Sequence, residues 1–316
     1  MSMPAFAVDE FGAIGSIHEI PIPEPDDGEV LVSVRAAGVN VMDPLYVGGM
    51  LKDYMEHRFP LVPGIDLAGV VAAIGKGVDA FALGDAVYGF SAKKFVGAGT
   101  FAGSVVVNSS DLAPKPTTLG FAEAAAVPHA GLTALAAVAA TDPQPGQVVV
   151  VVGSTGGVGS FVTQLAAARG ATVVAVSARA GVALARELGA GEVIDYEAVD
   201  VAETIREQYP EGVDALITMY GDLETVTPIA RTVRSGGLVV SPAIRPDAAA
   251  AFADFGVGFK SASRLPGARL PELTALIDSG QLRVPPLTTF SLERTNDALQ
   301  EMATGHVRGK LVIEIG

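Results

Sequence analysis

The chain has 316 residues, and a content of 49 % hydrophobic and 18 % charged residues excludes an intrinsically disordered protein. A chain of this length predicts roughly two domains. The formal net charge of -14 argues against nucleic acid as a partner, because the average field of the protein repels a polyanion.

The first third of the chain predicts a β-rich domain. Apolar and polar residues alternate over residues 30–35, and residues 67–74 and 105–107 form short apolar runs. Glycine and proline interrupt these runs at short intervals, as in a small barrel or a partly open sandwich. A helix is expected near Pro44, with Asp43 as its capping residue.

After Pro114-Lys115-Pro116 the pattern changes to alternating helices and buried strands. Residues 148–152 are consecutive valines, which is typical of a strand covered on both faces. Further strands are predicted over residues 173–176, 193–195, 215–218 and 238–241, and helices over 158–169, 181–188, 201–208 and 223–233. This alternation predicts an α/β fold with a doubly wound parallel sheet of the Rossmann type. The last part of the chain predicts helices over 270–278 and 292–304 and a strand over 311–315.

The valine strand leads directly into Gly153-Ser154-Thr155-Gly156-Gly157-Val158-Gly159 and then into a helix. Phosphate oxygens need backbone N–H donors at close range, and a glycine-rich turn at a helix N-terminus provides them. The literal G-x-G-x-x-G pattern fails, because Ser154 holds the place of the first glycine. A tight turn that only packs is the alternative, but the complete strand–turn–helix context favours dinucleotide binding by residues 153–158.

The end of the second predicted strand indicates which dinucleotide binds. An NAD site places Asp or Glu there to bind the ribose 2′-hydroxyl, whereas this chain has Ser177-Ala178-Arg179. A hydroxyl and a guanidinium match a 2′-phosphate, so Ser177 and Arg179 predict NADPH as the cofactor. The alternative is that Arg179 is an ordinary solvated arginine.

Several further segments form a pattern through their order and spacing. They are AGVNVMD (37–43), FPLVPGIDLAG (59–69), GDAVYG (84–89), EAAAVP (123–128), GLTA (131–134), LGA (188–190), IDY (194–196) and GKLV (309–312). Together with the glycine turn, they make nearly the whole chain resemble the zinc-free NADPH:quinone oxidoreductases of the medium-chain dehydrogenase/reductase superfamily. The resemblance implies a GroES-like catalytic domain, residues 1–118 completed by 261–316, with a Rossmann domain inserted at 119–260.

The resemblance also bears on metal content. Zinc-dependent members carry Cys near the position of Asn40 and His-Glu where Ile65-Asp66 stand. This chain has no cysteine, and its four histidines show no metal-ligand spacing, so no metal site is predicted.

The resemblance implies roles for individual residues. Asn40 and Tyr46 would line the nicotinamide end of the cleft, Asn40 orienting cofactor or substrate and Tyr46 donating to a substrate oxygen. Thr133 would lie near the nicotinamide, Tyr196 near the adenosine phosphate and Lys310 near the cleft edge. Gly181 stands where many relatives have a lysine for the 2′-phosphate, and Arg179 is expected to replace it. Residues 46–55 and 242–260 are expected to shape the substrate pocket.

Structural roles are the alternatives for several of these residues. Asn40 could bond only its own loop, and Tyr46 could be a half-buried helix residue with a solvated hydroxyl. Asp66 is expected to be structural, and His129 to be a core or loop histidine.

The resulting hypothesis is a zinc-independent enzyme that transfers hydride from NADPH to a small-molecule quinone or α,β-unsaturated carbonyl. The alternatives are a pathway-specific enoyl reductase or tailoring enzyme, and an NADPH-binding protein with little turnover. No apolar stretch predicts a membrane span, and residues 1–10 do not resemble a signal peptide, so we expect a cytoplasmic protein. The family resemblance implies a homodimer.

Overall fold

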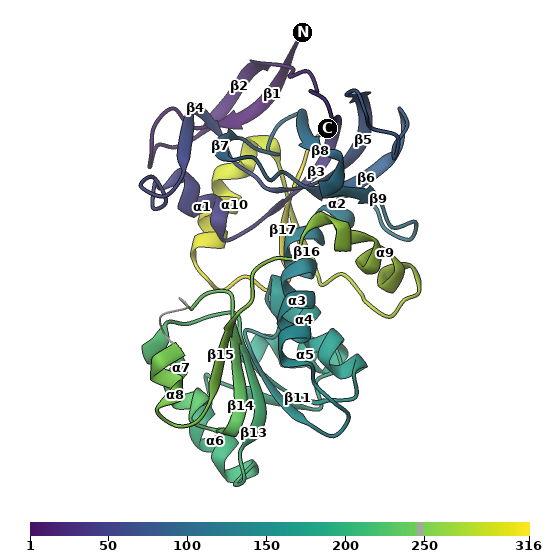
Figure 1. Cartoon of the computed structure of the whole chain (residues 1–316). Helices are drawn as coiled ribbons and strands as arrows, with labels where there is room; N and C mark the ends of the chain where they lie inside the picture. The colour runs from purple at the N-terminus through teal and green to yellow at the C-terminus, as the bar shows by residue number, and fades with distance from the viewer. Residues whose placement is uncertain (245–248) are drawn as a thin grey trace. The chain divides into compact units, whose positions relative to one another are not determined.

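In the computed structural model, which describes residues 1–244 and 249–316, the two ends of the chain fold together and the middle forms a second unit (Figure 1). Unit 1 contains residues 1–129 and 266–316, and unit 2 contains residues 130–265. Residues 245–248, part of one predicted pocket loop, lie outside the described residues.

This division differs from the expected boundaries at 118/119 and 260/261. Helix α2 (Phe121–Ala125) packs against strands β3 (Glu29–Val39) and β5 (Asp66–Ile74), which belong to unit 1. A cut at 118/119 would have separated α2 from the sheet on which it packs.

Unit 1 is built on a seven-stranded sheet. The strand order is β16-β17-β3-β5-β6-β9, and β8 pairs with β3 outside this path. Two smaller sheets, β1–β2 and β4–β7, complete the unit. The remaining strands are β1 (Ser2–Ala7), β2 (Ser16–Pro21), β4 (Glu56–Val62), β6 (Ala86–Phe90), β7 (Phe95–Ala98), β8 (Ser104–Asn108), β9 (Leu112–Pro114), β16 (Leu287–Ser291) and β17 (Lys310–Glu314), and the helices besides α2 are α1 (Met42–Val47), α9 (Leu270–Asp278) and α10 (Thr295–Ala303).

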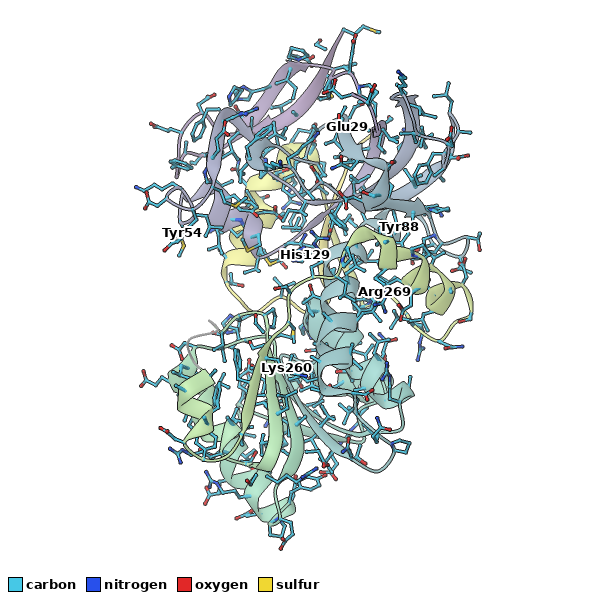
Figure 2. All side chains as sticks on the ribbon, viewed as in Figure 1. Glu29, Tyr54, Tyr88, His129, Lys260 and Arg269 are labelled. Atoms are coloured by element: carbon cyan, nitrogen blue, oxygen red, sulfur yellow. The ribbon has the colours of Figure 1, made fainter. Side chains whose placement is uncertain are left out.

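The alternation over residues 30–35 places Val30, Val32 and Val34 in the core of unit 1, where all three are buried. A polar contact joins the C-terminal segment to this sheet. Tyr88 on β6 is buried, and its hydroxyl donates to the carbonyl of Leu270 on α9 over 2.9 Å (Figure 2). Segments from the two ends of the chain therefore share one core.

Helix α1 begins differently from the sequence prediction. Val41 is its N-cap and makes no side-chain cap bond, so the expectation that Asp43 caps the helix is wrong. Asp43 lies within the first turn and is buried. Its carboxylate accepts hydrogen bonds from the backbone N–H of Asn40 over 2.7 Å and of Gly64 over 3.1 Å, and so ties α1 to the loop before β5.

Unit 2 contains a six-stranded parallel sheet in the order β12-β11-β10-β13-β14-β15. The order reverses beside β10, as in a dinucleotide-binding Rossmann fold, and this confirms the predicted fold class. Helices α4 and α5 lie on one side of the sheet and α6, α7 and α8 on the other (Figure 1). The elements are α3 (Pro128–Thr141, in this unit from residue 130), β10 (Val148–Val152), α4 (Gly157–Ala168), β11 (Thr172–Ser177), α5 (Val182–Glu187), β12 (Glu192–Asp195), α6 (Val201–Gln208), β13 (Val213–Thr218), α7 (Leu223–Ala230), β14 (Val233–Ser241), α8 (Ala249–Ala253) and β15 (Gly258–Ser261).

The helix predicted over residues 223–233 is too long at its C-terminal end. Helix α7 ends at Ala230, and Val233 already pairs with Val213 in the sheet. Helix α3 and the sixth strand, β15, were not predicted. Within the described residues, no helix is both long and apolar enough to cross a membrane.

Candidate active site

The glycine-rich turn of unit 2 joins β10 to α4. Gly153 has a φ of +74°, which side chains disfavour, and Gly156 is the N-cap of α4. A Cβ on Gly159 would lie 2.0 Å from the carbonyl oxygen of Gly153, so only glycine lets the helix approach the end of the strand this closely. The backbone N–H groups of the first turn of α4 have no acceptor within the helix, which makes this end of the helix suitable for phosphate.

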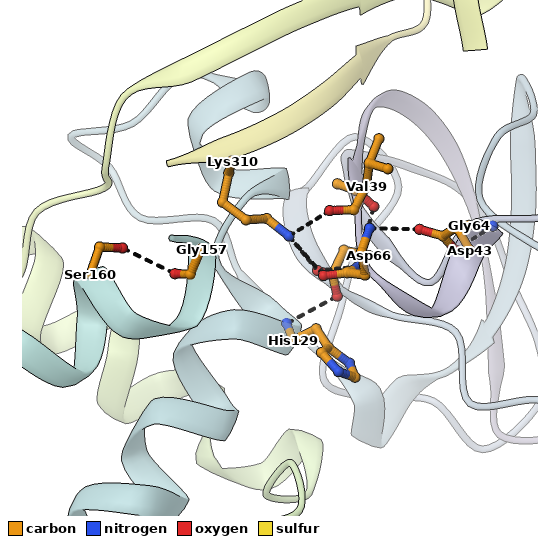
Figure 3. Close-up of polar contacts among 10 residues, drawn as sticks. Val39, Asp43, Gly64, Asp66, His129, Gly157, Ser160 and Lys310 are labelled. Carbon is orange, nitrogen blue, oxygen red and sulfur yellow. Dashed lines mark hydrogen bonds and ion pairs between the residues drawn. The ribbon is translucent and has the colours of Figure 1, made fainter. Parts of the chain in front are cut away.

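Side chains hold the turn in this shape. Ser154, in the place of the first glycine, is buried, and its hydroxyl donates to the carbonyl of Val176 on β11 over 3.1 Å. Thr163 donates to the carbonyl of Gly159 over 2.9 Å, and Ser160 to that of Gly157 over 3.0 Å (Figure 3). These hydroxyls donate to carbonyl groups and do not occupy the backbone N–H groups of the first turn of α4. The turn therefore fits the pyrophosphate of a dinucleotide.

The residues predicted to bind the 2′-phosphate follow β11. Arg179 is 78 % exposed, and its Nε lies 3.2 Å from Oδ2 of Asp195. Ser177 is buried and donates to the carbonyl of Ala178 over 3.2 Å, so its hydroxyl is used within its own loop. Of this predicted pair, Arg179 is the one whose side chain reaches solvent.

The structure explains the glycine at position 181. A Cβ on Gly181 would lie 2.8 Å from Oγ1 of Thr155, which is itself buried in the glycine-rich turn. A lysine at this position would require Thr155 to move. The cation for a 2′-phosphate must therefore come from elsewhere in this loop.

Two further predicted cofactor residues also lie in unit 2. The backbone N–H of Tyr196 donates to the carbonyl of Ser177 over 3.2 Å, which places Tyr196 beside the predicted 2′-phosphate loop. Partial burial raises the pKa of Tyr196, and Glu197, Tyr220 and Asp195 act in the same direction. Its hydroxyl therefore stays protonated at neutral pH and can donate. Thr133 is buried on α3.

In unit 1, Asn40 is the centre of a buried polar cluster, defined here as Asn40, Asp43, Asp66 and Lys310. Figure 3 labels Asp43, Asp66 and Lys310 of this cluster. Lys310 donates to Oδ1 of Asn40 over 2.7 Å and to the carbonyl of Val39 over 2.9 Å. The amide nitrogen of Asn40 donates to Oδ2 of Asp66 over 3.1 Å and to the carbonyl of Gly38 over 3.4 Å. The orientation of the Asn40 amide is therefore fixed from both sides.

The charges of this polar cluster are shielded from water. Nζ of Lys310 lies 3.9 Å from Oδ2 of Asp66, and the other carboxylate oxygen of Asp66 accepts the backbone N–H of His129 over 3.0 Å. Burial raises the pKa of Asp43 to about 7, outweighing its two backbone hydrogen bonds. Burial also lowers the pKa of Lys310, although Asp66 and Asp43 oppose this shift. Asp66 has the structural role expected for it, as a partner of Asn40 and Lys310.

Lys310, which is expected near the cleft edge, is buried in unit 1. Strand β17 pairs with β3 so that Leu311 lies opposite Val39, and this register brings residue 310 next to Asn40. The side chain of Lys310 is only 4 % exposed. Sequence reasoning missed this contact, because it depends on a strand pairing between the two ends of the chain.

Tyr46 lies on α1 and is half-buried against the core of unit 1. Its ring centroid is 6.4 Å from that of His57, whose Nδ1 lies 2.8 Å from the carbonyl oxygen of Met55. A cavity of about 50 Å³ borders Tyr46, with Gly64 and Phe95 among its other lining residues. Tyr46 is therefore a half-buried aromatic residue that lines a cavity of unit 1.

No group of three or more His, Asp or Glu side chains suited to a metal ion is found among the residues that the structure describes. At the positions expected for zinc ligands in related enzymes, Asn40 and Asp66 bond to each other and to Lys310.

Comparisons with known proteins match both units. The family described as alcohol dehydrogenase GroES-like domain matches residues 26–117, and that described as zinc-binding dehydrogenase matches residues 188–313. A chloroplastic NADPH-dependent alkenal/one oxidoreductase of Arabidopsis thaliana is 31 % identical, over 98 % of this chain and 79 % of the relative. A chloroplast envelope quinone oxidoreductase homolog of the same plant is 27 % identical, over 96 % of this chain and 95 % of the relative. The solved structure of the quinone oxidoreductase from Coxiella burnetii superposes with a TM-score of 0.86 at 27 % identity and covers 100 % of both chains.

Proposed function

Because the chain belongs to the quinone oxidoreductase family of the medium-chain dehydrogenase/reductase superfamily, we propose that it uses NADPH to reduce quinones or α,β-unsaturated carbonyl compounds. The observation that carries this proposal is the turn at residues 153–159. Gly159 allows α4 to meet the end of β10, and the first turn of α4 presents backbone N–H groups. The names of the two plant relatives support the same substrate class.

Each unit contributes its own part of the chemistry. When bound, NADPH supplies the hydride for the reduction. In unit 2, the N-terminus of α4 binds the pyrophosphate, and the guanidinium of Arg179 binds the 2′-phosphate. Tyr196, which lies next to this loop, donates a hydrogen bond from its hydroxyl to the same phosphate. Thr133 on α3 is proposed to lie near the nicotinamide.

In unit 1, Tyr46 is proposed to stabilise the substrate. Negative charge develops on the carbonyl oxygen of a quinone or enone as it is reduced, and a placed hydrogen-bond donor stabilises that charge. Tyr46 lines a cavity of unit 1, and its hydroxyl is a donor of this kind. Both protons of the Asn40 amide already bond to Asp66 and Gly38, so we assign Asn40 to positioning the loop before α1.

Zinc independence is part of the proposal. A metal cation near Asp66 would be repelled by the ammonium of Lys310, which lies 3.9 Å from this carboxylate. We expect less than stoichiometric zinc by elemental analysis and unchanged activity in EDTA. About one zinc per chain together with chelator-sensitive activity would contradict this part.

The expected homodimer and the expected cytoplasmic location also remain proposals. Light scattering coupled to size-exclusion chromatography would measure the mass in solution, and a monomer would contradict the first. Fractionation of the source cells would test the second.

The assay for the proposed function follows the near-ultraviolet absorbance of NADPH with a panel of benzoquinones, naphthoquinones and short enones. Consumption of NADPH that depends on both protein and carbonyl compound supports the proposal. Tight NADPH binding without turnover on any compound would contradict it and favour a binding protein. Turnover confined to one enone would favour a pathway-specific reductase.

A further inference from the structure

Two carboxylates lie against the arginine that is proposed to bind the 2′-phosphate. Oδ2 of Asp195 accepts from Nε of Arg179 over 3.2 Å, and Oε2 of Glu197 accepts from the backbone N–H of Arg179 over 3.1 Å. The other oxygen of Asp195 accepts from the backbone N–H of Glu197 over 3.0 Å. Asp195 is thus held in place from two sides.

The sheet register explains why Asp195 reaches this loop. Ser177 at the end of β11 and Asp195 at the end of β12 are direct partners in neighbouring parallel strands. The side chain of Asp195 is 17 % exposed, whereas that of Arg179 is 78 % exposed. The carboxylate of Asp195 is therefore held at the end of the edge strand β12, whereas the guanidinium of Arg179 extends into solvent.

NAD sites of this fold place an acidic residue at the end of the second strand, where it binds the ribose 2′-hydroxyl. Here β11 ends without one, and the neighbouring strand β12 supplies a carboxylate to the same loop. A 2′-phosphate approaching Arg179 must share this cation with Asp195 and also meets the negative charge of Asp195. A 2′-hydroxyl meets no such repulsion and can donate to a carboxylate.

We propose that Asp195 is a specificity-determining residue that limits the preference for NADPH over NADH, so that the protein accepts both cofactors. The proposal deepens the proposed function and rests on it. Arg179 favours the phosphorylated ribose, and Asp195 offsets part of that advantage through charge repulsion and through its ion pair with Arg179.

The variant that tests this is Asp195→Asn, which removes the charge and keeps the shape of the side chain. The matched control is Glu211→Gln, which removes one exposed charge just before the amino-terminal end of the central strand β13, whereas Asp195 lies at the carboxyl-terminal end of β12. Two unit charges about 4 Å apart in water change a binding constant by about fivefold, and a 2′-phosphate carries about two charges at most. We therefore expect Asp195→Asn to tighten the binding of 2′,5′-ADP by about 5- to 25-fold relative to 5′-AMP.

Calorimetric titration of both nucleotides, and then of NADPH and NADH, measures this without turnover. Asp195→Ser, which removes the charge with a smaller side chain, should give the same shift, and Glu211→Gln should give none. An unchanged ratio of 2′,5′-ADP to 5′-AMP affinity in both Asp195 variants would overturn the inference while leaving the proposed function intact. Failure of the unsubstituted protein to bind any of these nucleotides would overturn both.

Discussion

Lys310 donates a hydrogen bond to Oδ1 of Asn40 over 2.7 Å, although the two residues are 270 positions apart in the sequence. The bond is buried and joins β17, near the C-terminus, to the loop before α1. Lys310 also faces the carboxylate of Asp66. One ammonium group thus fixes the Asn40 amide and balances a buried negative charge.

Removing this ammonium should destabilise the protein strongly. Lys310→Met leaves Asp66 as a buried carboxylate without its cation, and breaking a buried pair costs about 3–5 kcal/mol. Lys310→Met/Asp66→Asn removes both charges of this ion pair, so the loss of unfolding free energy should be smaller than the sum of the single losses by about 0.5–3 kcal/mol. Urea unfolding of the four proteins measures this coupling. Additive losses would show that the two residues do not interact.

Tyr46→Phe should lower turnover and leave NADPH affinity nearly unchanged. Loss of a donor to the developing oxyanion costs on the order of 10²-fold in kcat. Tyr54→Phe is the matched control, because Tyr54 is 78 % exposed in the segment after α1 (Figure 2). Steady-state kinetics and NADPH titration on each variant are the measurements. Equal turnover in Tyr46→Phe and the control would show that Tyr46 only packs against the core and does not stabilise the oxyanion.

Arg179→Ala should weaken NADPH binding and spare NADH binding. A charge-assisted hydrogen bond is worth roughly 10- to 100-fold in affinity, and solvent exposure of Arg179 places the expected loss near tenfold. Added salt should weaken NADPH binding more in the unsubstituted protein than in the variant. Arg186→Ala, which removes an exposed arginine from α5, is the control. Similar losses for both cofactors would mean that Arg179 supports the loop and does not select the phosphate.

The buried carboxyl of Asp43 should make stability depend on pH. Its pKa is about 7 in the folded protein, against about 4 in an unfolded chain. Between these values the folded protein binds a proton that the unfolded chain does not, so this contribution to the unfolding free energy is full below about pH 4 and is lost as pH rises to about 7.

Asp43→Asn removes that contribution, so its unfolding free energy should fall less steeply over this pH range than that of the unsubstituted protein. Urea unfolding at several pH values between about 4 and 7 measures the two slopes. Parallel slopes would show that Asp43 is already ionised in the fold.

Five of the six strands of the Rossmann sheet could be predicted because their signals are local. The valines of β10 are a continuous apolar run whose three central members are buried. The C-terminal end of α7 could not be predicted in this way. Its apolar pattern continues to Val233, and only the pairing of Val233 with Val213 shows that the chain has already entered the next strand.

The candidate site shows the same distinction. Gly159 and the turn around it could be identified from one contiguous segment. The burial of Lys310 could not, because it follows from the pairing of β17 with β3. The position of the Asp195 carboxylate beside Arg179 likewise depends on the register between β11 and β12, and the sequence of either strand alone does not predict this register.

Reduction of a carbonyl substrate with hydride from NADPH is the central claim, and isotope transfer tests it most directly. The purified protein is incubated with an enone and NADPH deuterated at the transferring position of C4, each deuterated face being used in turn, and the product is analysed by mass spectrometry. We expect one deuterium per product molecule, carried on the β-carbon, from one face of the cofactor only. A saturated product without deuterium from either face, or no product at all, would contradict the claim.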